Sequence, residues 1–157
     1  MGHLKDFHVL VTPKSYGVAD ESLKTELQEQ AASVVFNQHG RLYTPEELVS
    51  LITDVDAVIA GNEIFDANVI NKAKRLKVIS RYGVGLENID LKAATNQGII
   101  VTNTPGANAD SVAELTLGLI INLTRRICEL NRATKSGQWL YRRAFSLKDK
   151  TIGVIGY

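Results

Sequence analysis

The chain has 157 residues, 45% of them hydrophobic and 22% charged, which is typical of one soluble globular domain with a sizeable core. Its 18 lysines and arginines and 17 acidic residues give a formal net charge of +1, which argues against nucleic acid as a main partner. Cys128 is the single cysteine, so an intrachain disulfide and a cysteine-based metal site are both excluded.

Two further classes are disfavoured by the distribution of apolar residues. The first residues, MGHLKDFHVLV, contain no long apolar segment with a cleavage site, so we expect no secretory signal and a cytoplasmic protein. The most apolar stretch, 112–123, contains Glu114 and is too short to span a membrane.

The histidines have no carboxylate or cysteine at ligand spacing, so we expect no metal site.

Short β-branched runs alternate with helical patterns along the first hundred residues. Thr44, Pro45 and Glu47 mark a helix start with a capping box, and Asp66 and Asp90 are expected caps of the next two helices. The pattern predicts strands at 7–12, 33–36, 57–60, 76–80 and 99–103, with helices at 21–32, 44–52, 66–73 and 91–97 between them. This βαβαβαβαβ order predicts an α/β fold: an open, doubly wound parallel sheet with helices on both faces.

Ligands of such sheets bind beyond the carboxyl ends of the strands. The loops expected there are 12–17, 61–63, 81–85 and 103–108, and we call this side of the sheet the carboxyl edge. Asp54 and Asp56 precede the third strand, at the opposite end, where we expect them to be solvated or to cap the chain.

The pattern changes after residue 108. Leu115, Leu119 and Leu123 continue at helical spacing to Leu130, which predicts one long helix over about 109–135, with Ser111 and Glu114 as its capping box. A β-rich run then resumes at 151–156. We therefore expect three parts: a domain at 1–108, a helical connection at 109–150 and the first strand of another domain at 151–157.

The RYGVG loop at 81–85 directly follows a strand. Two glycines two residues apart let successive backbone N–H groups turn toward a carboxylate or phosphate, although a flexible turn without a ligand fits the pattern equally well. Arg81 is either an anion-binding residue or an ordinary surface arginine. Asn103 and Asn108 serve either as turn and cap residues or as ligand contacts, the latter at the start of the long helix.

The stretch LKVISRYGVGLENIDLKAATNQGIIVTNTPGANADSVAELTLGLIINLTRRI (76–127), followed by SGQW and LKDKTIGVIGY, resembles the D-isomer-specific 2-hydroxyacid dehydrogenases, with the phosphoglycerate branch closest. This resemblance implies a flavodoxin-like substrate domain joined by a long interdomain helix to a Rossmann domain, here truncated. It also implies NAD as cofactor, with NADP not excluded, a small 2-hydroxy or 2-keto acid as substrate, and a homodimer.

The resemblance assigns roles residue by residue. The backbone amides of Gly83, Val84 and Gly85 would bind the substrate carboxylate. Arg81 would lie near the anionic groups of the substrate, and Asn108 would also lie near the substrate. Val84 and Val112 would approach the cofactor. Gly156 would be the first glycine of the dinucleotide-binding fingerprint.

Two departures from the family pattern stand out. Animal-type phosphoglycerate enzymes carry an arginine after the third strand, where this chain has Gly61, Asn62 and Glu63. An acid there opposes a phosphate, which favours an uncharged-tail substrate, while 3-phosphoglycerate of serine biosynthesis stays as an alternative. The family's catalytic arginine, glutamate and histidine have no counterpart up to Tyr157, so we expect the chain alone to be inactive.

A self-contained flavodoxin-like binding or regulatory domain is the competing hypothesis. A phosphoacceptor domain needs acidic residues after the first strand and at the end of the third, where this chain has Thr12-Pro13-Lys14 and Gly61. An FMN-binding domain needs a hydroxyl-rich phosphate loop after the first strand, and the TPKSYG loop is a poor match to one.

Overall fold

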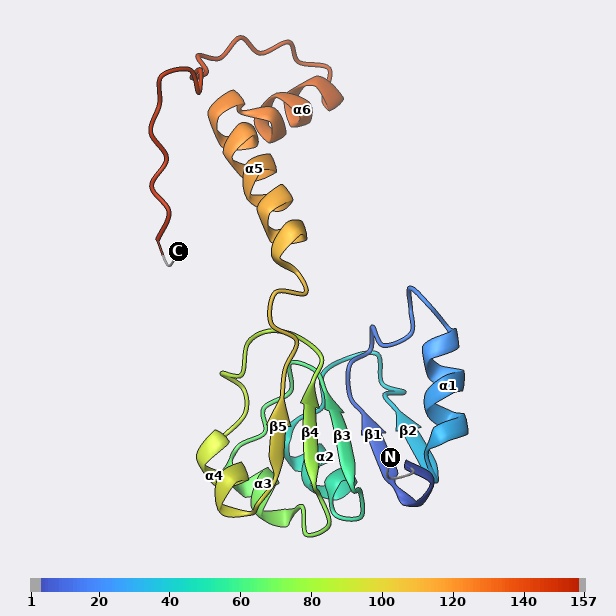
Figure 1. The fold of residues 1–157 in the computed structure, drawn as a ribbon. Coiled ribbons are helices and arrows are strands. Elements are labelled where there is room, and N and C mark those ends of the chain that lie inside the picture. Colours follow the sequence, from blue (N-terminus) through green and yellow to red (C-terminus); the bar gives the residue numbers. More distant parts are fainter. Residues whose placement is uncertain (1–3, 156–157) are drawn as a thin grey trace. The chain divides into compact units, whose positions relative to one another are not determined.

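The computed structural model describes residues 4–155. They divide into two compact units, one ending at Ala107 and the other starting at Asn108, and each is described by itself. Figure 1 shows the first unit as a sheet with helices and the second as a helical segment followed by extended chain.

Five parallel strands form the sheet of the first unit. They are β1 (His8–Val11), β2 (Ser33–Phe36), β3 (Ala57–Ala60), β4 (Val78–Arg81) and β5 (Ile100–Thr102), in the order β2-β1-β3-β4-β5. This is the flavodoxin-like order, in which the chain switches direction across the sheet between β1 and β3. The predicted open parallel sheet is confirmed, and the switch point lies between the ends of β1 and β3.

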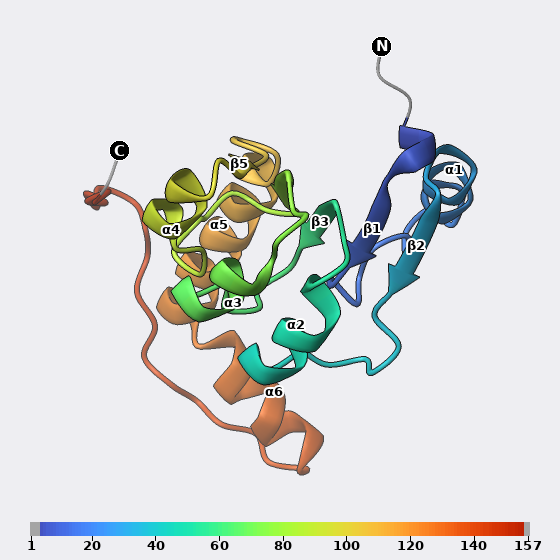
Figure 2. The ribbon, with the colours of Figure 1, turned by 90° about the horizontal axis from the view of Figure 1, so that it is seen from below.

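Helices cover both faces of this sheet. Successive strand residues point to opposite faces, so Val9 and Val11 pack with Leu27 of α1, while Leu10 and Val58 join the core on the other face. The helices are α1 (Ser22–Gln30) on one face and α2 (Pro45–Ile52), α3 (Ala67–Lys72) and α4 (Leu91–Asn96) on the other, after a short 3-10 helix, η1 (Leu4–Asp6). Figure 2 shows α1 across the sheet from α2 and α3.

The predicted helix starts are confirmed by their hydrogen bonds. At α2 the Thr44 side chain accepts from the Glu47 amide, and the Glu47 carboxylate accepts from the Thr44 amide at 2.8 Å. Asp66 caps α3 and Asp90 caps α4, each accepting an amide bond of 2.9 Å from the residue three positions on. The Arg41 guanidinium, with the Thr44 amide, lowers the pKa of Glu47 to about 2.

Asp56 is buried rather than solvated, which corrects our expectation. It lies just before β3 and is 3% exposed, and its Oδ2 accepts from the His8 amide and from Arg75 Nη2, each at 3.0 Å. Lys77 Nζ lies 3.5 Å from Oδ1. Burial raises the pKa of Asp56, but the His8 amide and Arg75 outweigh it and hold the pKa below its usual value. This carboxylate ties the starts of β1, β3 and β4 together.

The predicted single long helix of the second unit is wrong. The helix breaks into α5 (Ala109–Arg125) and α6 (Ile127–Lys135) at Arg126, whose φ of 57° is left-handed. The Asn122 side chain accepts from the Cys128 amide at 2.9 Å and so starts the new helix. The capping box at Ser111 is also wrong, because α5 begins two residues earlier, after Asn108.

No strand forms at 151–155, which corrects the described part of the expected strand at 151–156. A strand exists only where it pairs with another, and within residues 4–155 this run has no such partner. The end of the run, including Gly156, lies outside the described residues. None of the described helices combines the length and apolar character needed to cross a membrane.

Candidate functional site

The loop after β4 is anchored to the loop after β3 at the carboxyl edge. Arg81 closes β4 and is 9% exposed, and the next residue, Tyr82, donates its amide to Ala60 O at 2.9 Å. This bond extends the β3–β4 pairing by one residue into the loop. The 81–85 loop therefore starts from a fixed point.

Gly83 is required by the conformation of this loop. Its φ of +152° is one that residues with a side chain rarely adopt, and an added Cβ would lie 2.8 Å from Arg81 Nη1. The guanidinium of Arg81 thus packs directly against the Gly83 Cα. At Gly85, the second glycine that the sequence singled out, an added Cβ would meet the Glu87 carboxylate, but the φ of Gly85 is not positive.

The carbonyl groups of the loop determine where its amides point. Gly83 O accepts from the Thr104 amide at 3.0 Å, and Val84 O accepts from Asn103 Nδ2 at 2.7 Å. In a trans peptide unit the N–H points opposite to the C=O. The amides of Val84 and Gly85 therefore point away from residues 103–104, and neither has a hydrogen-bond partner among the described residues.

Two successive free N–H groups on one side of a loop form an anion-binding concavity. Such a pair matches the two oxygens of a carboxylate, and hydrogen bonds to an ionised acceptor are stronger than neutral ones. The Val84 side chain is 38% exposed beside these amides and offers an apolar surface for the rest of a ligand.

Arg81 organises the two loops. Its Nε donates to Gly85 O at 3.1 Å, and its Nη1 donates to Tyr82 O at 2.5 Å and to Ala60 O at 3.4 Å. Its Nη2 donates to Asn62 Oδ1. These bonds use four of the five N–H groups of a guanidinium, which leaves one for a ligand. Direct contact of Arg81 with substrate stays a prediction.

A buried polar cluster lies beside the switch point. Thr12 and Glu63 are 0% and 1% exposed, and the Thr12 hydroxyl donates to Glu63 Oε2 at 2.5 Å and accepts from the Gly61 amide at 2.8 Å. A Cβ on Gly61 would lie 2.6 Å from the same carboxylate oxygen. An arginine at position 61 is thus incompatible with Glu63 in this position.

Tyr82 and Tyr16 form an aromatic pair at the same edge. Their ring centroids are 5.9 Å apart in an edge-on arrangement, and the Tyr82 side chain is half exposed. Burial, with smaller contributions from Glu26 and Tyr82, raises the pKa of Tyr16, which stays a neutral phenol at physiological pH.

Four of the predicted site residues come together, namely Arg81, Gly83, Val84 and Gly85. Asn108 and Val112 belong to the second unit, where Asn108 precedes α5 and Val112 lies in its first turn, both exposed. The sequence reasoning missed the roles of Thr12, Glu63, Asn103 and Thr104. Their positions in the loops that follow β1, β3 and β5 were the available signal.

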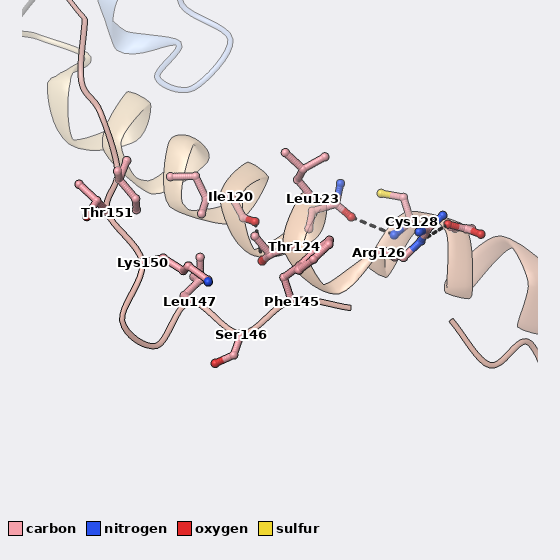
Figure 3. Close-up of a pocket in the computed structure, with 13 residues that line it drawn as sticks. Ile120, Leu123, Thr124, Arg126, Cys128, Phe145, Ser146, Leu147, Lys150 and Thr151 are labelled. Carbon is pink, nitrogen blue, oxygen red and sulfur yellow. Dashed lines mark hydrogen bonds and ion pairs between the residues drawn. The ribbon is translucent and has the colours of Figure 1, made fainter. Parts of the chain in front are cut away.

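A separate hollow of about 850 Å³ lies within the second unit (Figure 3). Its lining is mostly apolar, with Ile120, Leu123 and Phe145 among its residues. The Arg126 guanidinium in its wall is paired with Glu129 at 2.6 Å. We place the candidate site at the 81–85 loop instead, because two free backbone amides lie there on one side of the loop.

Residues 9–151 match the family model described as the catalytic domain of D-isomer specific 2-hydroxyacid dehydrogenase. The chain belongs to this family. It is 46% identical over 117 residues to D-3-phosphoglycerate dehydrogenase of Methanocaldococcus jannaschii. It is 45% identical over 118 residues to glyoxylate reductase of Thermofilum pendens.

These matches cover 72% and 71% of this chain but only 22% and 35% of the two relatives, so the chain spans about a fifth to a third of their length. A crystal structure of NAD+-bound 3-phosphoglycerate dehydrogenase from Entamoeba histolytica aligns with a TM-score of 0.62 at 29% identity. That alignment covers 76% of this chain and 40% of the other, and it supports the α/β fold.

Proposed function

We propose that this chain is the substrate-binding part of an NAD-dependent dehydrogenase of D-2-hydroxy acids. The observation that carries the proposal is the pair of free amides of Val84 and Gly85, held in one direction by Thr104 and Asn103. In this proposal they bind the carboxylate that every 2-hydroxy and 2-keto acid shares. The family membership and the names of the relatives support the same reading.

The expected affinity follows from the two hydrogen bonds. Each hydrogen bond to a charged group contributes about 1.5–3 kcal/mol, which for two amides gives about 3–6 kcal/mol. That corresponds to a Kd on the order of 1 mM for a small carboxylate. We therefore expect the 157-residue chain to bind small carboxylates with millimolar affinity. Tighter binding is expected only for ligands that make further contacts.

NAD is the cofactor we propose for the complete enzyme, and NADP stays open. When bound, the dinucleotide exchanges a hydride with C2 of the substrate. The family resemblance assigns two residues to this cofactor: Val84, whose exposed side chain lies beside the free amides, and Val112, 52% exposed in the first turn of α5. Gly156 keeps its proposed fingerprint role. We propose that the chain alone binds carboxylate without turnover.

For the substrate tail we propose an uncharged group, as in glyoxylate or hydroxypyruvate, rather than a phosphate. Glu63 excludes a side chain at position 61, and most of the Arg81 N–H groups already bind protein acceptors. Lys14 is exposed in the loop after β1, and it is the cation that we expect to contact a phosphate tail if the substrate has one. 3-Phosphoglycerate therefore remains the alternative substrate, in line with one of the two relatives.

The experiment is a comparison of pyruvate with pyruvamide, which has the same shape but no carboxylate. Titration into the 157-residue chain should give millimolar binding of pyruvate and glyoxylate and at least tenfold weaker binding of pyruvamide. Adding phosphohydroxypyruvate to the series tests the tail. Equal binding of pyruvate and pyruvamide would contradict a carboxylate site, and a strong preference for phosphohydroxypyruvate would contradict the uncharged tail.

We also propose a homodimer and a cytoplasmic location. Support for self-association comes from the second unit, where Leu115, Leu119 and Trp139 are 63%, 57% and 91% exposed. Sedimentation or gel filtration at two concentrations tests it, and a strict monomer would count against it. The alternative of a flavodoxin-like cofactor-binding or regulatory domain is disfavoured. The Thr12 hydroxyl, in the loop that would bind a cofactor phosphate, is buried and donates to Glu63 instead.

A further inference from the structure

The cluster around Glu63 is coupled to the segment that links β3 to the next loop. The Thr12 hydroxyl donates to Glu63 and thereby presents its lone pair to the Gly61 amide. Asn88 Nδ2 donates to the carbonyls of Gly61 and Glu63, at 3.1 and 2.6 Å. The side chains of Thr12 and Asn88, from two different loops, therefore hold the backbone of residues 61–63.

This same segment supplies the acceptors that fix the start of the 81–85 loop. Ala60 O accepts from the Tyr82 amide and from Arg81 Nη1, and Asn62 Oδ1 accepts from Arg81 Nη2. Arg81 in turn holds Gly85 O and Tyr82 O. Hydrogen bonds at both sides of the 60–62 backbone thus connect Thr12, at the end of β1, to Arg81 and the loop with the free amides.

Glu63 is poorly explained as a stabilising residue. Its Oε1 is buried and has no hydrogen-bond partner among the described residues. A buried acceptor without a donor costs stability, so an apolar residue would serve the core better. The carboxylate does one thing that an apolar residue cannot, which is to orient the Thr12 hydroxyl.

We propose that Thr12 and Glu63 are positioning residues for the carboxylate site. Through the 60–62 segment they hold Arg81 and the 81–85 loop in the arrangement that turns the amides of Val84 and Gly85 outward. The proposal rests on the proposed function, because those amides are the groups that bind the substrate carboxylate. Neither residue touches the substrate in this account.

The test uses the ¹⁵N-labelled 157-residue chain and a matched pair of variants. Thr12→Val removes the hydroxyl while keeping the shape, and Thr12→Ser restores the hydroxyl. Amide hydrogen exchange is followed at Tyr82 and Thr104, with the Ile99 amide, bonded to Ala94 O, as reference in the same unit. Pyruvate affinity is measured on the same samples.

Relative to Ile99, exchange at Tyr82 and Thr104 should become at least tenfold faster in Thr12→Val and stay near the wild-type rate in Thr12→Ser. Pyruvate affinity should fall at least fivefold in the first variant and recover in the second. If Thr12→Val does not fold, Asn62→Ala is used in its place. The Asn62 side chain is exposed, so this change should be tolerated, and it removes only the acceptor of Arg81 Nη2.

Wild-type exchange at both amides in Thr12→Val and in Asn62→Ala would overturn the positioning role. This outcome is distinct from failure of the proposed function, which would show as absence of pyruvate binding by the wild-type chain. The exchange rates are measured without ligand, so they decide the positioning role in either case.

Discussion

Replacement of Gly83 by alanine should damage both the stability and the carboxylate site. The φ of +152° is one that residues with a Cβ rarely adopt, and holding such a conformation costs about 1–3 kcal/mol. The new Cβ would also lie 2.8 Å from Arg81 Nη1, so the guanidinium must move from Tyr82 O and Gly85 O. Losing these two bonds costs about 2 kcal/mol together, which brings the total to about 3–5 kcal/mol.

Gly98→Ala is the matched control for Gly83→Ala. Gly98 also has a positive φ, +69°, but nothing lies within 4 Å of an added Cβ. We expect it to lose about 1–2 kcal/mol in urea unfolding and to keep pyruvate binding unchanged. Gly83→Ala should lose more stability and bind pyruvate at least tenfold more weakly. Wild-type pyruvate binding by Gly83→Ala would refute the reasoning about the loop.

Three further variants test other parts of the account. Asn103→Ala removes the donor to Val84 O and should weaken pyruvate binding by about fivefold, the equivalent of about 1 kcal/mol, in the same titration. Asp56→Asn should lower the unfolding free energy at pH 7 by about 1.5–3 kcal/mol. Because the pKa of Asp56 is held below 3.8, this difference should shrink as the pH falls below that value. Glu47 has a folded pKa of about 2 against 4.5, so its contribution is complete above pH 4.5 and is lost toward pH 2. Urea midpoints at pH 7 and pH 3 should therefore differ less in Glu47→Gln than in the wild-type chain, and an equal difference would contradict the role of the Arg41 pair.

Local signals predicted most of the first unit. Helix caps act over three residues, so Thr44, Asp66 and Asp90 were readable from sequence, and each makes the expected bond. The alternation of short apolar runs with helices likewise predicted the parallel sheet and the loops of its carboxyl edge. Asp56 was misjudged, because its carboxylate is paired with Arg75, 19 residues further along in the loop before β4.

The break between α5 and α6 was missed for a different reason. The apolar spacing continues across it from Leu123 to Ile127 and Leu130, so periodicity gives no sign of an interruption. The residue that adopts the left-handed conformation is Arg126, where a glycine would have been the usual signal. Asn122, whose side chain caps α6, was the only local indication.

At the candidate site, sequence placed the loop but not its internal bonding. The glycines of 81–85 and the preceding strand predicted backbone anion binding, and the free amides of Val84 and Gly85 fit that prediction. Arg81 donates to Ala60 O and to Asn62 Oδ1, which lie 21 and 19 residues earlier in the chain. No local pattern reports such pairings.

The most direct test of the central claim is a residue-resolved pyruvate titration of the ¹⁵N-labelled chain by NMR. The account predicts that the largest saturable shifts occur at the Val84 and Gly85 amides, with a Kd on the order of 1 mM and little response to pyruvamide. Unshifted Val84 and Gly85 amides at saturating pyruvate, or larger shifts around the hollow between α5, α6 and residues 145–152, would contradict it.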